Sequence, residues 1–157
     1  MPKFQQASPG RVLFTLLASI VFAAGLVFPG MAFSDDSAIT HTKDSAELEW
    51  GACPPFMPEG CAIAVLQGNP AEPNADVFFK LAANSTVSAH THTSVERMVL
   101  VSGELEVEYE GQSAEVLTPG NYAYGPAGLP HSATCRPGAD CVLFIAFEEP
   151  VDAMPAD

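Results

Sequence analysis

Polar and apolar residues alternate most clearly in GELEVEYEG, residues 103–111. One parity carries Glu104, Glu106, Glu108 and Glu110, and the other carries Leu105, Val107 and Tyr109. Successive side chains of a strand point to opposite faces, so this segment predicts a strand with one solvated and one buried face. Four carboxylates spread along one strand do not converge on a single calcium ion, and we therefore expect them to face water.

Short apolar runs separated by turn residues continue on both sides of this strand. CAIAVLQ, VFFKLA, ERMVLV and CVLFIAF are separated by segments rich in Gly, Pro and Asn, such as GNPAEPNAD and GPAG. No window between residues 60 and 148 sustains a helical period for three turns. The pattern predicts one all-β domain, a sandwich or a barrel, over residues 60–148.

The ends of the chain have a different character. Residues 1–34 carry Lys3 and Arg11 before an uncharged, largely apolar run that ends in small residues, which is typical of a secretory signal peptide. Cleavage after Ser34 is our first expectation and cleavage after Ala32 the second, with an uncleaved membrane anchor as the alternative. Residues 35–59 are interpreted as a linker and a proline-rich segment, and residues 149–157 as a disordered tail.

Charge restricts the partners. Removing residues 1–34 leaves four basic against 19 acidic residues. So acidic a chain repels nucleic-acid phosphates and anionic lipids, which argues against nucleic-acid binding and, once the signal is cleaved, against membrane association. We expect a periplasmic or secreted protein.

The four cysteines, Cys53, Cys61, Cys135 and Cys141, lie in the part expected to be exported, where thiols tend to oxidise. Three pairings are open, and local order favours Cys53 with Cys61 and Cys135 with Cys141. A zinc site made by all four is the alternative, although the spacings lack a tight C-x2-4-C knuckle.

Two of the four histidines are concentrated in AHTHTSVERMVLVSG, residues 89–103. His90 and His92 project from the same face of an extended segment, and Glu96 shares their parity if the strand continues. With Gly103 the spacing becomes H-x-H-x3-E-x6-G.

A second cluster follows in GNYAYGPAGLPHSATC, residues 120–135, where Gly120, Pro126, Gly128 and His131 form the pattern G-x5-P-x-G-x2-H. A hairpin at these turn residues returns His131 beside the first strand. Three imidazoles and one carboxylate suit a divalent ion of iron, manganese, nickel or zinc and leave two octahedral positions open.

The two patterns together resemble the two motifs of the cupin superfamily, and the region before the barrel is similar to small exported single-domain cupins of unassigned activity. The resemblance implies a double-stranded β-helix, or jelly roll, with a metal bound by His90, His92, Glu96 and His131, and a homodimer. Two positions depart from the pattern: Asn84 replaces the usual opening Gly, and Cys135 replaces a frequent final Asn.

Open metal positions suit a cupin dioxygenase acting on a small uncharged or weakly acidic molecule, with Glu96 as the catalytic base; isomerase or lyase chemistry ranks lower. Cupin sulfonium lyases have similar ligands, but Arg97-Met98 replaces the tyrosine expected after Glu96. Oxalate-type chemistry is disfavoured because arginine is scarce. Tyr122 and Tyr124 are expected to pack in the core. The alternative function is a non-catalytic module that binds metal or a small ligand.

Overall fold

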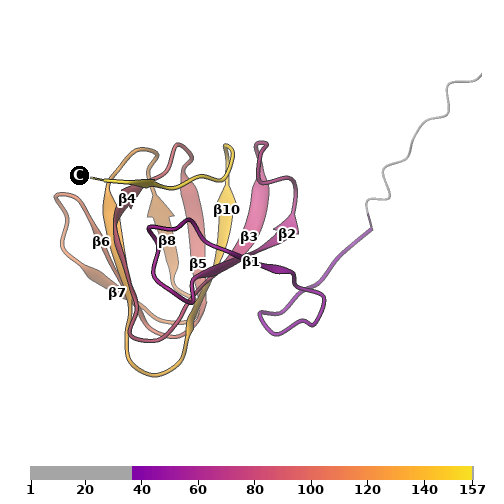
Figure 1. Cartoon of the computed structure of the whole chain (residues 1–157), viewed down its shortest axis with the longest axis horizontal. Coiled ribbons are helices and arrows are strands. Elements are labelled where there is room, and N and C mark those ends of the chain that lie inside the picture. Colours follow the sequence, from indigo (N-terminus) through magenta and orange to yellow (C-terminus); the bar gives the residue numbers. More distant parts are fainter. Residues whose placement is uncertain (1–36, 157) are drawn as a thin grey trace, which may run out of the picture. The chain divides into compact units, whose positions relative to one another are not determined.

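The computed structural model describes residues 37–156, and within them it contains eleven β-strands and no helix (Figure 1). The strands are β1 (Trp50–Ala52), β2 (Ala62–Gln67), β3 (Ala75–Leu81), β4 (Thr86–Thr91), β5 (Glu96–Ser102), β6 (Leu105–Tyr109), β7 (Glu115–Leu117), β8 (Tyr122–Gly125), β9 (His131–Cys135), β10 (Cys141–Phe147) and β11 (Met154–Pro155). The all-β prediction is thereby confirmed. No helix able to cross a membrane occurs in this part of the chain.

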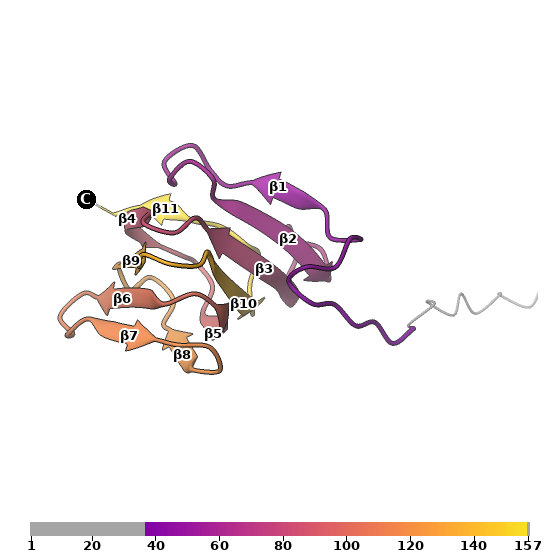
Figure 2. The same ribbon diagram turned by 90° about the horizontal axis from the view of Figure 1, so that it is seen from below.

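The strands form two antiparallel sheets. One sheet has the order β1-β2-β3-β10-β5-β8, and the other has the order β11-β4-β9-β6-β7. Figure 2 shows β1, β2 and β3 on one side of the molecule and β6 and β7 on the other. Consecutive strands such as β4 and β5 lie in different sheets, so the chain crosses between the layers repeatedly, as a jelly roll requires.

Alternation along each strand places the core between the sheets. In β6, Leu105 and Val107 are buried while Glu108 is exposed, as the sequence pattern predicts. The largest fully buried apolar side chains are Leu81, Leu100, Val77 and Val87. On the outer face, the guanidinium group of Arg136 donates to Glu104 at 2.8 Å and to Glu106 at 2.7 Å. Two of the four carboxylates of this row therefore form ion pairs with an arginine.

Two disulfides are present, Cys53–Cys61 and Cys135–Cys141. Both pairings are those that local order favours, and the four-cysteine zinc site is excluded because no cysteine is free. Cys135 ends β9 in one sheet and Cys141 begins β10 in the other, so this bond ties the layers together. Disulfides persist in oxidising compartments and therefore indicate a protein outside the cytoplasm.

Two expectations need correction, and a third falls outside the described residues. The tail is not disordered from residue 149 to 156, because β11 pairs with β4 and joins the second sheet. Tyr122 and Tyr124 are 59% and 50% exposed, since β8 is an edge strand whose alternation turns Ala123 inward instead. β1 adds a short edge strand to the proline-rich segment. The expected signal peptide, residues 1–34, lies outside the described residues.

Candidate metal centre and its chamber

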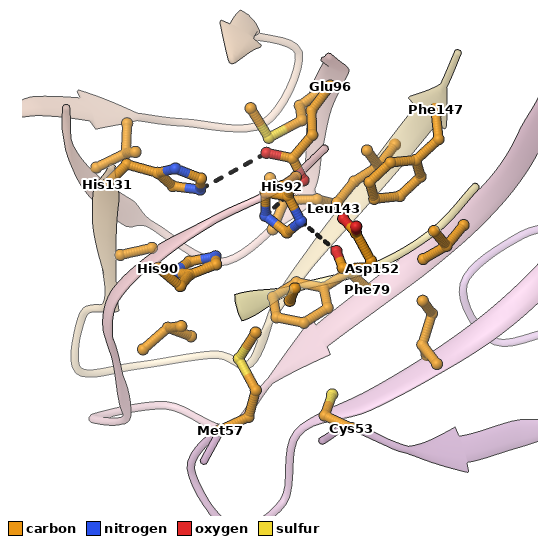
Figure 3. A pocket seen from close by; sticks show the side chains of 18 of the residues that line it. Cys53, Met57, Phe79, His90, His92, Glu96, His131, Leu143, Phe147 and Asp152 are labelled. Atoms are coloured by element: carbon orange, nitrogen blue, oxygen red, sulfur yellow. Dashed lines mark hydrogen bonds and ion pairs between the residues drawn. The ribbon is translucent and has the colours of Figure 1, made fainter. Parts of the chain in front are cut away.

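The three histidines of the two motifs converge between the sheets. His90 lies on β4 and His131 begins β9, and the antiparallel register of these strands makes the two residues direct partners. His92 follows the end of β4. One ring nitrogen from each of the three side chains lies within 4.8 Å of the other two, and all three residues are buried. Figure 3 shows the rings facing one another at one end of a chamber.

Each imidazole is oriented through its Nδ1 atom. Nδ1 of His90 lies 2.9 Å from the carbonyl oxygen of Ser88, and Nδ1 of His131 lies 3.2 Å from that of Leu129. Nδ1 of His92 bonds the carbonyl oxygen of Asp152. A carbonyl can only accept, so each Nδ1 carries the proton and donates, which leaves Nε2 with a free lone pair. This is the tautomer and orientation that metal-binding histidines adopt.

Glu96 reaches the cluster from the opposite sheet. Its Oε1 atom lies 3.4 Å from Nε2 of His92, and its Oε2 atom lies 3.6 Å from Nε2 of His131. The sequence analysis gave Glu96 the parity of the two histidines on the condition that their strand continues. In the structure the strand ends at Thr91, and the chain crosses to β5 before Glu96. The four residues are nevertheless brought together.

Burial governs the protonation of these groups. It lowers the pKa of His90 and of His131 from 6.5 to about 4, with smaller contributions from neighbouring imidazoles. Both rings are therefore neutral, and able to donate lone pairs, over the physiological pH range. Burial raises the pKa of Glu96, and the nearby His92 opposes this shift in part. A carboxyl with a raised pKa in a cleft is a candidate for proton transfer.

The donor set fits a divalent metal ion. Nε2 of His92 and Oε2 of Glu96 are buried without a hydrogen-bond partner among the described residues. Buried polar atoms of this kind are costly unless something pairs with them. A cation at the centre of the cluster would pair with both at once, so the residues that are present suit the ion that the motifs imply.

The motif glycines shape the turns around the cluster. Gly103 has a φ of 81°, and a Cβ there would lie 2.8 Å from backbone atoms of Asp140 and Cys141, so only glycine fits. Gly128, with a φ of 71°, donates its N–H to the carbonyl oxygen of His92 at 2.8 Å and so joins the second motif to the first.

Other motif positions hold turns further from the cluster. Gly120 donates its N–H to the carbonyl oxygen of Leu100 at 2.8 Å, and the carbonyl oxygen of Pro126 accepts from Leu129 at 3.3 Å. Asn84 adopts a φ of 64°, the conformation for which the substitution of Gly by Asn is tolerated.

Two residues that the sequence interpretation did not assign also belong to the site. Tyr109 pairs with His131 across β6 and β9, and the ring centroids lie 5.0 Å apart. Its position on the inward-facing side of the strand predicted for GELEVEYEG could have indicated that it faces the site. Asp152 offers its carbonyl to His92 from the tail, where no sequence pattern marks it.

The ChrR cupin-like domain model matches residues 38–150. Comparison with curated proteins gives no match.

Solved structures show the same fold at low identity. The DMSP lyase DddQ from Ruegeria pomeroyi has a TM-score of 0.61 at 18% identity, over 69% of this chain and 61% of that one. The polyketide cyclase RemF from Streptomyces resistomycificus has a TM-score of 0.62 at 16% identity, over 76% and 87%. An uncharacterized protein with a double-stranded β-helix domain from Klebsiella pneumoniae has a TM-score of 0.54 at 16% identity, over 64% and 88%. The chain thus spans less than two thirds of the lyase.

At such identities these likenesses establish the double-stranded β-helix alone. The family match covers most of the chain and includes all three converging histidines. The chain therefore belongs to the ChrR cupin-like family of the cupin superfamily.

Proposed function

We propose that the protein is an exported cupin that binds one divalent metal ion through His90, His92, Glu96 and His131. We further propose that it works as a mononuclear non-haem metal enzyme of the dioxygenase type. Its substrate would be a small uncharged or weakly acidic organic molecule. Iron, manganese, nickel and zinc all accept this donor set, and iron or manganese suits the proposed redox reaction.

The observation that carries the proposal is the common orientation of the three imidazoles. Every Nδ1 is bonded to a backbone carbonyl, so every Nε2 lone pair is available to one point. A bound ion would supply a site where a substrate oxygen and dioxygen bind side by side. Glu96 would offset part of its charge and, with a raised pKa, would hold or release a proton there.

Solved structures with this fold include enzymes, a lyase and a cyclase, which supports catalysis in general without selecting the reaction. The two disulfides support the export part of the proposal, a periplasmic or secreted location. A homodimer, which the superfamily resemblance implies, completes the proposal, and light scattering would test it.

The alternative is a non-catalytic module that holds a metal or a small ligand. The nearly apolar lining of the chamber favours it, because few groups besides Glu96 and Tyr109 could move a proton. To separate the two, the protein would be purified with its native metal. Oxygen consumption and spectral changes would then be followed against a panel of phenols, diketones and small sulfur compounds, with His131→Ala as the control.

Turnover that the variant loses would support the enzyme. Stoichiometric metal without turnover, together with unchanged ligand affinity in His131→Ala, would favour the binding module.

A further inference from the structure

The histidine cluster opens onto a chamber of about 260 Å³ between the sheets. Apart from the three histidines, Glu96, Tyr109 and Asp152, its walls are formed by apolar side chains and disulfide sulfur, among them Cys53, Met57, Phe79, Leu143 and Phe147 (Figure 3). An apolar cavity of about 150 Å³ is large enough to bind benzene. The chamber therefore has room for a molecule with an apolar body of about one ring.

No lysine or arginine of the described residues lines this chamber. Lys43 pairs with Asp44, and Lys80 lies over the ring of Trp50 at 4.3 Å. Arg97 pairs with Glu148. Arg136 binds two glutamates on the outer face.

An anionic ligand in the chamber would consequently lose its hydration without gaining a lysine or arginine as a partner, which is strongly unfavourable. The side chains of the chamber therefore favour an uncharged ligand, and charge compensation for a weakly acidic one would have to come from a bound metal ion.

One polar group on the chamber wall has no assigned role. The hydroxyl of Tyr109 is buried and has no hydrogen-bond partner among the described residues. The hydroxyl of a tyrosine usually finds a partner when it is buried. His90, His131 and Tyr109 lie side by side in register on the adjacent strands β4, β9 and β6. Turning the hydroxyl toward water would move the Tyr109 ring out of this row.

The backbone opposite leaves space at this hydroxyl. Gly125 on β8 pairs with Glu96 on β5, and a Cβ at Gly125 would lie 3.0 Å from the hydroxyl oxygen of Tyr109 and 3.1 Å from Oε2 of Glu96. Both polar groups therefore approach the same glycine, one from each sheet. The absence of a side chain at this point keeps the hydroxyl and the carboxylate beside the histidine cluster.

We propose that the Tyr109 hydroxyl is the hydrogen-bond donor that holds the oxygen atom of an uncharged ligand whose apolar body fills the chamber. This inference rests on the proposed function, because it places the polar end of the substrate beside the three histidines. It adds the substrate class, an apolar molecule of about one ring with a carbonyl or hydroxyl group, and the residue that recognises it.

A matched pair of probes tests this. Acetophenone and ethylbenzene have nearly the same shape and differ in one carbonyl oxygen, and benzoate adds a negative charge. Binding of each to the purified, metal-free protein would be measured by calorimetry. Tyr109→Phe removes only the hydroxyl, and Tyr122→Phe makes the same change on the exposed face of β8.

We expect the protein to bind acetophenone about fivefold more tightly than ethylbenzene, the preference that one neutral hydrogen bond confers. Tyr109→Phe should lose this preference and keep its affinity for ethylbenzene, whereas Tyr122→Phe should keep both. Zinc affinity should be unchanged in Tyr109→Phe, which a merely structural role of the hydroxyl would not allow.

The inference is overturned if the preference survives in Tyr109→Phe, if the unmodified protein shows none, or if benzoate binds as tightly as acetophenone. Since the probes are measured without metal or turnover, failure of the protein to bind metal would contradict the proposed function while leaving this test intact.

Discussion

Ending the chain after Pro150 should weaken metal binding although it removes none of the four proposed ligands. The segment that is lost pairs with β4, and its Asp152 accepts a hydrogen bond from Nδ1 of His92. The Asp152 carboxylate also accepts from the N–H and hydroxyl of Thr93, at 2.8 and 2.7 Å. The segment therefore holds His92 in position. The family match ends at residue 150, so this contact lies outside it.

The size of the effect follows from which contacts remain. His90 and His131 bond carbonyls of Ser88 and Leu129, which the truncation keeps. Of the three imidazoles, only that of His92 loses the partner of its Nδ1 atom. Loss of one such partner typically lowers metal affinity by about 10- to 100-fold, equivalent to about 1.4–2.7 kcal/mol.

The assay is competition for zinc with a chromophoric chelator at pH 7, accompanied by circular dichroism to verify that the variant is folded. A chain ending at Ala156 is the matched control and should bind as the full chain does. Asp152→Ala keeps the carbonyl and should lose less affinity than the truncated chain. A folded truncated protein with undiminished zinc affinity would refute the reasoning.

Four further outcomes are expected. Gly125→Ala places a Cβ 3.1 Å from Oε2 of Glu96 and should weaken zinc binding about 10-fold in the same assay. The control Gly51→Ala makes only an ordinary 3.8 Å contact and should leave zinc binding unchanged. Equal effects of the two substitutions would contradict this prediction. In the metal-free protein, the pKa values of His90 and His131 are lower in the folded chain, at about 4, than in the unfolded chain, at 6.5. Between these pH values the unfolded chain binds more protons than the folded chain, so the unfolding free energy should fall as the pH is lowered from about 6.5 to about 4. The raised pKa of Glu96 acts in the opposite sense, so Glu96→Gln should make the fall between pH 6.5 and 4.5 steeper in urea unfolding, and a shallower fall would show the sign to be wrong. Reducing both disulfides, which close loops with sequence separations of 8 and 6, should cost about 2–3 kcal/mol each and lower the melting temperature by more than about 10 °C; a melting temperature unaffected by reductant would argue against their role.

The strand pattern and the two histidine motifs could be predicted because each depends on local rules. Alternation fixes which side of β6 is buried, and the turn residues mark where His131 returns beside His90. The replacement of Gly by Asn at position 84 could also be judged tolerable from the sequence, because a positive φ is a local property of the backbone.

The remaining features depend on contacts between distant segments. Glu96 comes from the opposite sheet because the chain crosses between layers after Thr91, which alternation alone does not reveal. Asp152 lies 60 residues from His92, in a tail whose composition suggested disorder. Tyr122 and Tyr124 are exposed because β8 turns Ala123 toward the core, and which face of this strand is buried is set by its pairing with β5.

The most direct test of the account is a crystal structure of the protein as purified, with diffraction data recorded on both sides of the absorption edge of the metal found in it. The account predicts one anomalous peak per chain, at about 2.0–2.2 Å from Nε2 of His90, His92 and His131 and from a carboxylate oxygen of Glu96. A peak elsewhere, or a protein that contains no metal and takes up none, would contradict it.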